Sequence, residues 1–148
     1  MTAVAAHAEG AYTKASGNSS HAEGKWSYSI GTGAHAEGIS CVANGSTDGA
    51  HAEGFAVSAI GVGSHAEGYR TLANEEGSHA EGRWSYASGK FAHAEGGSYN
   101  GSSYLSGGWA AGNGSHAEGL QTYAKGTASH AEGYATSALT AYSHAEGV

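Results

Sequence analysis

The chain is short of the residues that build an ordinary globular core. It has no proline, one methionine and two phenylalanines among 148 residues, whereas glycine occurs 26 times and alanine and serine fill much of the rest. Small side chains bury too little apolar area to offset chain entropy, so a core of Leu, Ile and Phe is disfavoured. Disorder would suit this composition, but nine tyrosines, three tryptophans and a strict repeat argue against it.

Positive charge, cysteine and long apolar runs are scarce as well. The six Lys and Arg residues do not cluster and the net charge is −7, which disfavours nucleic-acid binding. The single Cys41 excludes an internal disulfide, and no apolar run is long enough for direct membrane insertion. The first six residues lack the features of a secretory signal. We therefore expect a piece of a longer protein, a segment prepared for expression, or a part made in the cytosol such as a virion component.

Ten copies of the tetrapeptide His-Ala-Glu-Gly contain every histidine of the chain. Successive copies lie 14 residues apart in seven of nine intervals, and the exceptions are 16 residues after His35 and 23 after His93. A fixed short period indicates one coil that is repeated and stacked. A helical coil is disfavoured, because glycine recurs too often and no apolar stripe has a 3.6-residue period.

Aligned on the histidine, the repeat reads H-A-E-G-x-x-(T/S)-x-A-x-G-x-x-(S/A). Two-residue alternation predicts two short strands per coil, and in the first strand His and Glu share the side opposite to Ala. The small seventh, ninth and eleventh positions are predicted to fill the interior, with Cys41 as a buried residue of that kind. Glycine at the corners is expected to supply backbone freedom. The bulky, variable sixth and eighth positions are predicted to face outward.

These patterns predict an all-β fold, a parallel β-solenoid with 14-residue coils that forms one domain over residues 1–148. Two additions to the period are predicted to be loops. The first adds two residues around Ser46–Gly49, a segment of residue types that are common in turns. The second is an inserted loop around residues 97–108. Loops that project from a rigid solenoid are common places for contact with partners.

The histidine and glutamate columns are the candidate interface between chains. Both side chains are too large for the interior, and exposure to free water would not require ten copies. The remaining possibility is a semi-buried contact between chains, in which His and Glu satisfy each other's hydrogen bonds. The predicted ladder consists of His7, Glu9, His21, Glu23, His35, Glu37, His51, Glu53, His65, Glu67, His79, Glu81, His93, Glu95, His116, Glu118, His130, Glu132, His144 and Glu146.

The repeat resembles the YadA-like head of trimeric autotransporter adhesins. The resemblance covers His7 to Gly147 and rests on strands such as Ser64-His65-Ala66-Glu67-Gly68 and Ser85-Tyr86-Ala87-Ser88-Gly89. It implies a left-handed parallel β-roll that forms a homotrimer about its long axis. In this chain, His and Glu replace the apolar pair that lines the trimer interface of that family, which implies a polar interface. The heptad stalk and membrane anchor of a complete autotransporter are absent. Similar repeats also look like those of phage and prophage tail-fibre proteins.

Outward aromatic residues form a candidate ligand-facing surface for a glycan or a host-surface protein, although they could equally cover a neighbouring chain. The residues are Trp26, Tyr28, Trp84, Tyr86, Tyr99, Tyr104 and Trp109.

A native metal site is a weaker interpretation of the histidines, because a uniform ladder is more simply a hydrogen-bonded interface. A stronger interpretation is that anions or adventitious ions bind on the trimer axis. An ice-binding face is disfavoured, because the threonine column is interrupted and predicted to point inward. Ten equivalent positions provide no unique catalytic constellation, so we expect neither an enzyme nor a cofactor.

The sequence thus predicts a structural and adhesive head or shaft of a trimeric fibrous surface protein that attaches to a host or surface. Its expected place is extracellular, on a cell surface or a virion. A phage tail-fibre or receptor-binding segment is the first alternative, and an ion-binding repeat module is the second. Dependence of folding on a divalent ion would favour the ion-binding module.

Overall fold

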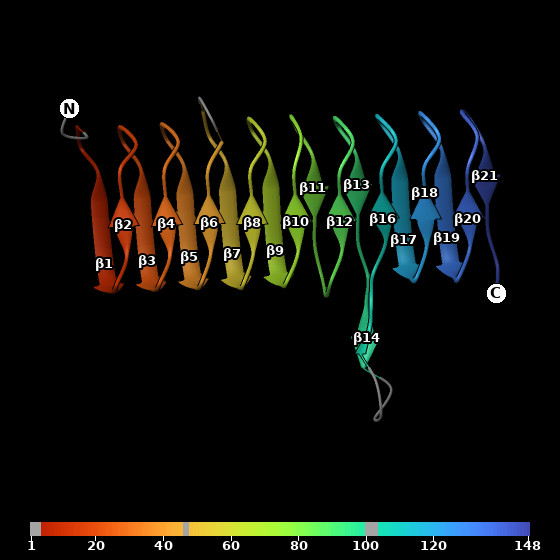
Figure 1. Cartoon of the computed structure of the whole chain (residues 1–148), viewed down its shortest axis with the longest axis horizontal. Helices are drawn as coiled ribbons and strands as arrows, with labels where there is room; N and C mark the ends of the chain where they lie inside the picture. Colours follow the sequence, from red (N-terminus) through yellow and green to blue (C-terminus); the bar gives the residue numbers. More distant parts are fainter. Residues whose placement is uncertain (1–3, 46–47, 100–103) are drawn as a thin grey trace.

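The computed structural model describes residues 4–45, 48–99 and 104–148, which form a stack of coils with two strands in most of them. The coils follow one another from the N-terminus to the C-terminus, so the two ends of the chain lie at opposite ends of a rod (Figure 1). This described part of the chain contains no helix, and hence none long and apolar enough to cross a membrane. The predicted parallel β-solenoid is confirmed, with about nine turns.

Two parallel sheets run along the rod. The first has ten strands, most of them five residues long, and each begins at the histidine of a repeat: β1 (His7–Ala11), β3 (His21–Lys25), β5 (His35–Ile39), β7 (His51–Phe55), β9 (His65–Tyr69), β11 (His79–Ala80), β13 (His93–Ala94), β17 (His116–Leu120), β19 (His130–Tyr134) and β21 (His144–Ala145). The second has nine strands of two residues: β2 (Lys14–Ala15), β4 (Tyr28–Ser29), β6 (Val42–Ala43), β8 (Ser58–Ala59), β10 (Leu72–Ala73), β12 (Tyr86–Ala87), β16 (Trp109–Ala110), β18 (Tyr123–Ala124) and β20 (Ser137–Ala138).

The strands pair in a register that places identical repeat positions side by side. In the first two coils, His7 pairs with His21 and Glu9 with Glu23. The same register is kept across the insertion, where His93 pairs with His116. Because each coil repeats the one before it, every position of the repeat becomes a column along the rod, separated by the strand spacing of about 4.8 Å.

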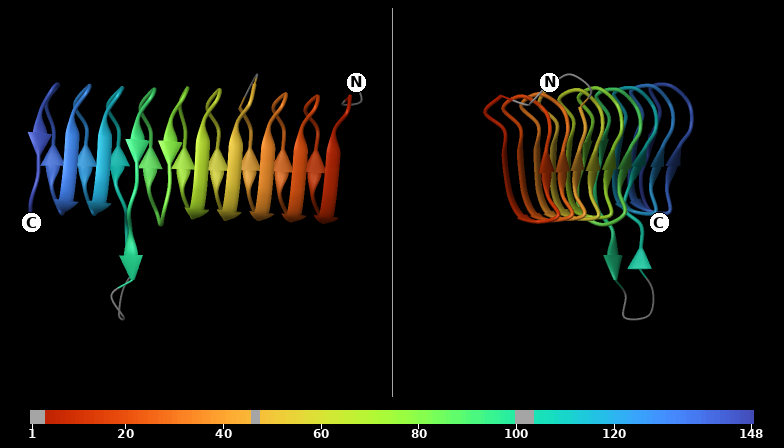
Figure 2. Two further views of the ribbon diagram at one scale, coloured as in Figure 1. Left: turned by 180° about the vertical axis from the view of Figure 1, so that it is seen from behind. Right: turned by 60° about the vertical axis from the view of Figure 1, so that its left-hand side comes forward.

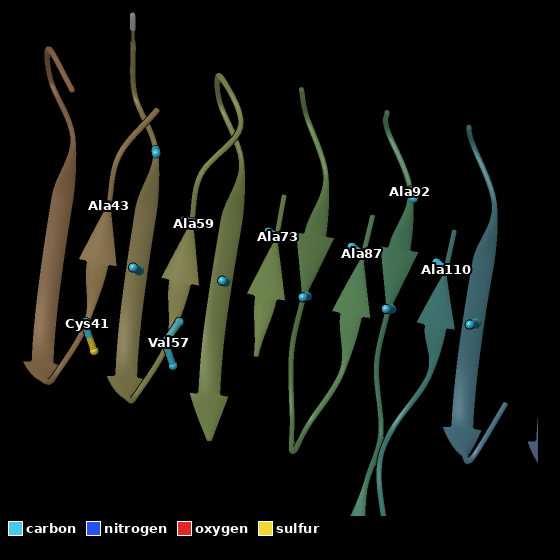
Figure 3. Close-up of a cluster of buried hydrophobic side chains, with 14 of the residues drawn as sticks. Cys41, Ala43, Val57, Ala59, Ala73, Ala87, Ala92 and Ala110 are labelled. Carbon is cyan, nitrogen blue, oxygen red and sulfur yellow. The ribbon is translucent and has the colours of Figure 1, made fainter. Parts of the chain in front are cut away.

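The interior between the two sheets holds only small side chains (Figure 3). The predicted seventh and ninth positions are buried, and Val57 is the largest side chain among the fully buried ones. The structure adds two columns that the sequence did not assign to the interior: the motif alanine and the residue before each histidine. Where that residue is serine, its hydroxyl donates to the carbonyl of the eleventh position, as Ser20 does to Gly17 at 2.6 Å. These bonds satisfy polar atoms in the buried interior of the coil.

The long insertion leaves the rod as an antiparallel hairpin. Strands β14 (Ser98–Tyr99) and β15 (Tyr104–Leu105) pair with each other and with no strand of the two long sheets. The hairpin projects from the edge at which β13 leads into β16 (Figures 1 and 2). After it, Trp109 returns to register with Tyr86. The insertion therefore adds a protrusion without interrupting either sheet.

Close backbone contact between coils makes the glycine at the fourth repeat position irreplaceable. Gly68 has φ +103°, and a Cβ there would overlap the Gly82 carbonyl of the next coil. Gly63 has φ +61°, but a Cβ there would meet nothing within 4 Å.

We expect Gly63→Ala to cost about 1 kcal/mol of folding free energy from its left-handed backbone alone. Gly68→Ala should cost at least ~3 kcal/mol or prevent folding, because backbone cannot move aside. Chemical denaturation of both variants measures this, and equal losses would contradict it.

Candidate functional site

The outward side of the ten-stranded sheet carries the histidine and glutamate columns, and we call it the ladder face. Adjacent imidazole rings lie 4.7–4.9 Å apart along the whole column. From His7 to His65 the rings are tilted against each other by 40–75°. From His65 to His144 they lie within 18° of parallel. The spacing of the strands therefore sets the distance between the rings, and in the C-terminal half of the sheet the rings form a regular stack.

In most coils, the histidine lies beside the glutamate two residues later. The Nε2 atom is 3.5–3.7 Å from a carboxylate oxygen in seven coils, which is longer than an ordinary hydrogen bond. Eight of the Nε2 atoms are covered and make no hydrogen bond within the described residues. They belong to His21, His35, His51, His65, His79, His93, His116 and His130. The ladder face thus holds donors and acceptors close together without pairing them fully.

Near the C-terminal end, the carboxylates also approach the histidine of a neighbouring coil. Glu118 lies 3.6 Å from His116 and 3.9 Å from His130. Glu132 lies 3.7 Å from His130 and 3.9 Å from His144. Three sets of side chains gather ligand atoms within 4.8 Å of one another: His116, Glu118 and His130; His130, Glu132 and His144; Glu81, His93 and Glu95. Each has the atom types that a transition-metal ion takes as ligands.

Burial and stacking favour the neutral form of three ladder histidines. The pKa of His35 is lowered first by burial and then by His51 and His21, against the opposing effect of Glu37 and Glu53. Burial followed by neighbouring histidines likewise lowers the pKa values of His65 and His93. Each imidazolium formed in this column would lie about one strand spacing from the next. At His35, His65 and His93, the neutral ring is consequently the form that the folded chain prefers.

Cys41 lies away from the ladder face, in the buried seventh column. Its Sγ approaches the Gly54 carbonyl at 3.2 Å, and burial is the main reason that the thiol pKa is raised. A raised pKa keeps the thiol protonated at neutral pH and thus unreactive. Cys41 serves as a small interior residue.

A pocket of about 360 Å³ opens beside the base of the hairpin. Trp109 is the most exposed ring of this aromatic pocket at 48%, and its centroid lies 6.3 Å from Tyr86 and 5.1 Å from Tyr123. The rings are tilted against one another, so they form a concave apolar surface. Polar side chains are also part of the lining. The full lining is Trp84, Tyr86, Ser106, Gly107, Trp109, Gln121, Thr122 and Tyr123.

The structure brings together three of the predicted ligand-facing residues, namely Trp84, Tyr86 and Trp109. Trp26 and Tyr28 lie in an N-terminal coil, where the Lys25 ammonium is 4.1 Å from the Trp26 ring. The backbones of Tyr99 and Tyr104 pair in the hairpin, and their side chains lie outside the described part. The predicted set omitted Tyr123, although the eighth position of the repeat places it beside Trp109.

The chain was compared with known proteins. No protein-family model matches it, and no curated protein sequence matches it as a relative.

Protonation of His35, His65 and His93 should weaken the fold. The folded pKa values of His35, His65 and His93 lie below the ordinary value of 6.5. The unfolded chain therefore binds more protons as the pH falls, and stability decreases. With chelator present, we expect the melting temperature to be level from pH 8 to about 6.5 and to fall between about 6.5 and 5, above the range where glutamates titrate. Thermal denaturation monitored by circular dichroism measures this. A midpoint that is constant or rises toward pH 5 would overturn the expectation.

Proposed function

We propose that this chain is a structural and adhesive module of a homotrimeric fibrous surface protein. The observation that carries the proposal is the ladder face, a long and regular surface of half-covered His and Glu side chains on one side of a thin rod. Its regularity along the rod suits a partner with the same repeat, and a second copy of the chain has that repeat.

Physical reasons favour covering this face. Parallel sheets in proteins are normally covered on both faces, whereas the ten-stranded sheet has only the thin interior on one side. The fifth repeat position shares the ladder face by alternation and exposes apolar side chains, among them Ile39 at 42%, Phe55 at 41% and Tyr134 at 43%. Association would bury this apolar column and give the half-exposed carboxylates of Glu23, Glu37 and Glu53 partners from other chains.

The resemblance to YadA-like heads favours a trimer. In such an assembly, three left-handed β-rolls would pack about a common long axis with their ladder faces turned inward. Alternating donors and acceptors of His and Glu would then align the coils of different chains, because a slip by part of a coil would leave polar groups unpaired. The rod would be stiff because each coil adds backbone hydrogen bonds to both neighbours.

Attachment would take place at the aromatic pocket. Flat aromatic rings pack against the apolar face of a sugar ring, and Gln121 and Ser106 offer hydrogen bonds to hydroxyl groups. The ligand we favour is a host-surface glycan. The rod would hold the pocket and the projecting hairpin away from the surface that bears it, either as an adhesin head on a cell or as a tail-fibre segment on a virion.

The mass of the chain in solution tests the assembly. We expect light scattering on a sizing column, at neutral pH with chelator, to give three times the chain mass of 14.7 kDa. The double variant Glu53→Arg/Glu67→Arg should give a monomer, because Arg is larger than Glu and offers only donors where the histidines of the other chains would need acceptors.

The matched control is Ser58→Arg/Ser137→Arg, which places the same side chains on the outward side of the nine-stranded sheet. The control should keep the trimer. A parent chain that is monomeric at all concentrations would remove the proposed interface, and a trimer that survives both double substitutions would place the interface elsewhere.

Binding to an array of immobilised glycans tests the attachment site. We expect Trp109→Ala to abolish the signal, with at least about a tenfold loss of affinity, because the substitution removes the central ring of the pocket. Trp26→Ala is the control, because Trp26 is exposed to a similar degree (43% against 48%) and lies outside the pocket. Equal losses in both variants, or the absence of any glycan bound by the parent chain, would contradict this assignment.

A further inference from the structure

The C-terminal half of the ladder face has the geometry of an incomplete metal site. In a tetrahedral zinc site the bonds to nitrogen and oxygen are about 2.0–2.1 Å, which separates neighbouring ligand atoms by roughly 3.3 Å. Glu118 lies 3.6 and 3.9 Å from the two histidines beside it, and Glu132 lies 3.7 and 3.9 Å from its two. These distances are too long for hydrogen bonds. These His–Glu distances are about 0.3–0.6 Å above the edge of a zinc tetrahedron, whereas the two stacked histidine rings of each set have centroids 4.8–4.9 Å apart.

The side chains concerned are free to close this gap. His116, Glu118 and His130 are 35–41% exposed, and the Nε2 atoms of His116 and His130 make no hydrogen bond within the described residues. Their backbones are fixed in register by β17 and β19. Rotation of the two stacked imidazoles toward each other would bring three ligand atoms onto one ion, while β17 and β19 keep the backbones in register.

We propose that this half of the ladder face binds divalent transition-metal ions, with Zn²⁺ as the best fit, at the sets His116–Glu118–His130 or His130–Glu132–His144 and at Glu81–His93–Glu95. Imidazole and carboxylate ligands suit Zn²⁺, Co²⁺ and Ni²⁺, whereas Ca²⁺ and Mg²⁺ take oxygen ligands. Each set supplies three protein ligands and leaves one position of a tetrahedron for water. The sets lie within one chain, so binding does not depend on the proposed trimer.

The overlap between two sets fixes the expected number of ions. His130 belongs to both C-terminal sets and offers one Nε2 atom, so an ion in one set excludes an ion in the other. The third set shares no residue with them. The chain should therefore take up two ions, one at the overlapping pair and one at Glu81–His93–Glu95, instead of one ion for each of the ten histidines.

Zn²⁺ titration by calorimetry at pH 7.5 tests this proposal, together with the visible absorption of bound Co²⁺ as a measure of tetrahedral nitrogen and oxygen ligation. We expect about two Zn²⁺ per chain. His130→Gln and His93→Gln should each reduce the number to about one, because each substitution removes one of the two independent sites. His7→Gln is the matched control, because His7 belongs to the same column but to none of the three sets.

The same titration on the Glu53→Arg/Glu67→Arg variant separates metal binding from association, because both substituted residues lie outside the three sets. Two ions bound to that variant as a monomer would support the proposal even if the parent chain is not a trimer. Failure to saturate at millimolar Zn²⁺ would overturn it. So would a number of ions that is unchanged in His130→Gln and His93→Gln, or one that is reduced equally in His7→Gln.

Discussion

The distance between stacked backbones is the constraint on which the rest of this structure depends. The two sheets enclose so little space that Val57 is the largest side chain among the fully buried ones, and most interior positions hold alanine or serine. Glycines at the fourth position face the carbonyl of the next coil directly. The fold therefore gains little from bulky apolar burial. Its cohesion comes from backbone hydrogen bonds that repeat along both sheets and from serine hydroxyls that pair with carbonyls inside the turns.

The same constraint determines the chemistry of the outside. Because like positions stack at the strand spacing, the outward His and Glu each form a continuous column, in which the neighbours of a residue are residues of the same type. An isolated histidine on a surface can take up a proton with little consequence, whereas a histidine in this column faces imidazoles on both sides. Glutamates beside the column partly offset that effect. The charge of the ladder face and its ability to bind ligands therefore depend on neighbouring side chains of the column acting together, and not on any single residue.

The period and the small columns were sufficient to predict the parallel solenoid, its strands and the outward position of His and Glu. Three features needed coordinates. The sixth position has a left-handed φ in residues such as Trp26, Arg70 and Gln121, and no glycine marks that corner. The interior role of the motif alanine depends on how closely the sheets approach. The aromatic pocket depends on where Ser106 and Gly107, at the base of the hairpin, lie beside Trp84 and Trp109, and the length of the insertion does not specify that position. The partners of the ladder face lie beyond a single chain, so neither sequence nor fold determines them.

Adjacent coils meet through the same His-Ala-Glu-Gly residues in an unchanged register. Removal or duplication of one 14-residue unit would keep these motif contacts on both sides of the joint. A gene that encodes such units can change the length of the rod in whole steps by unequal recombination, without selecting a new core each time. The hairpin shows that a coil can also carry an extra segment while its neighbours keep their pairing. The number of coils and the presence of a projecting hairpin can therefore vary independently of each other in this architecture.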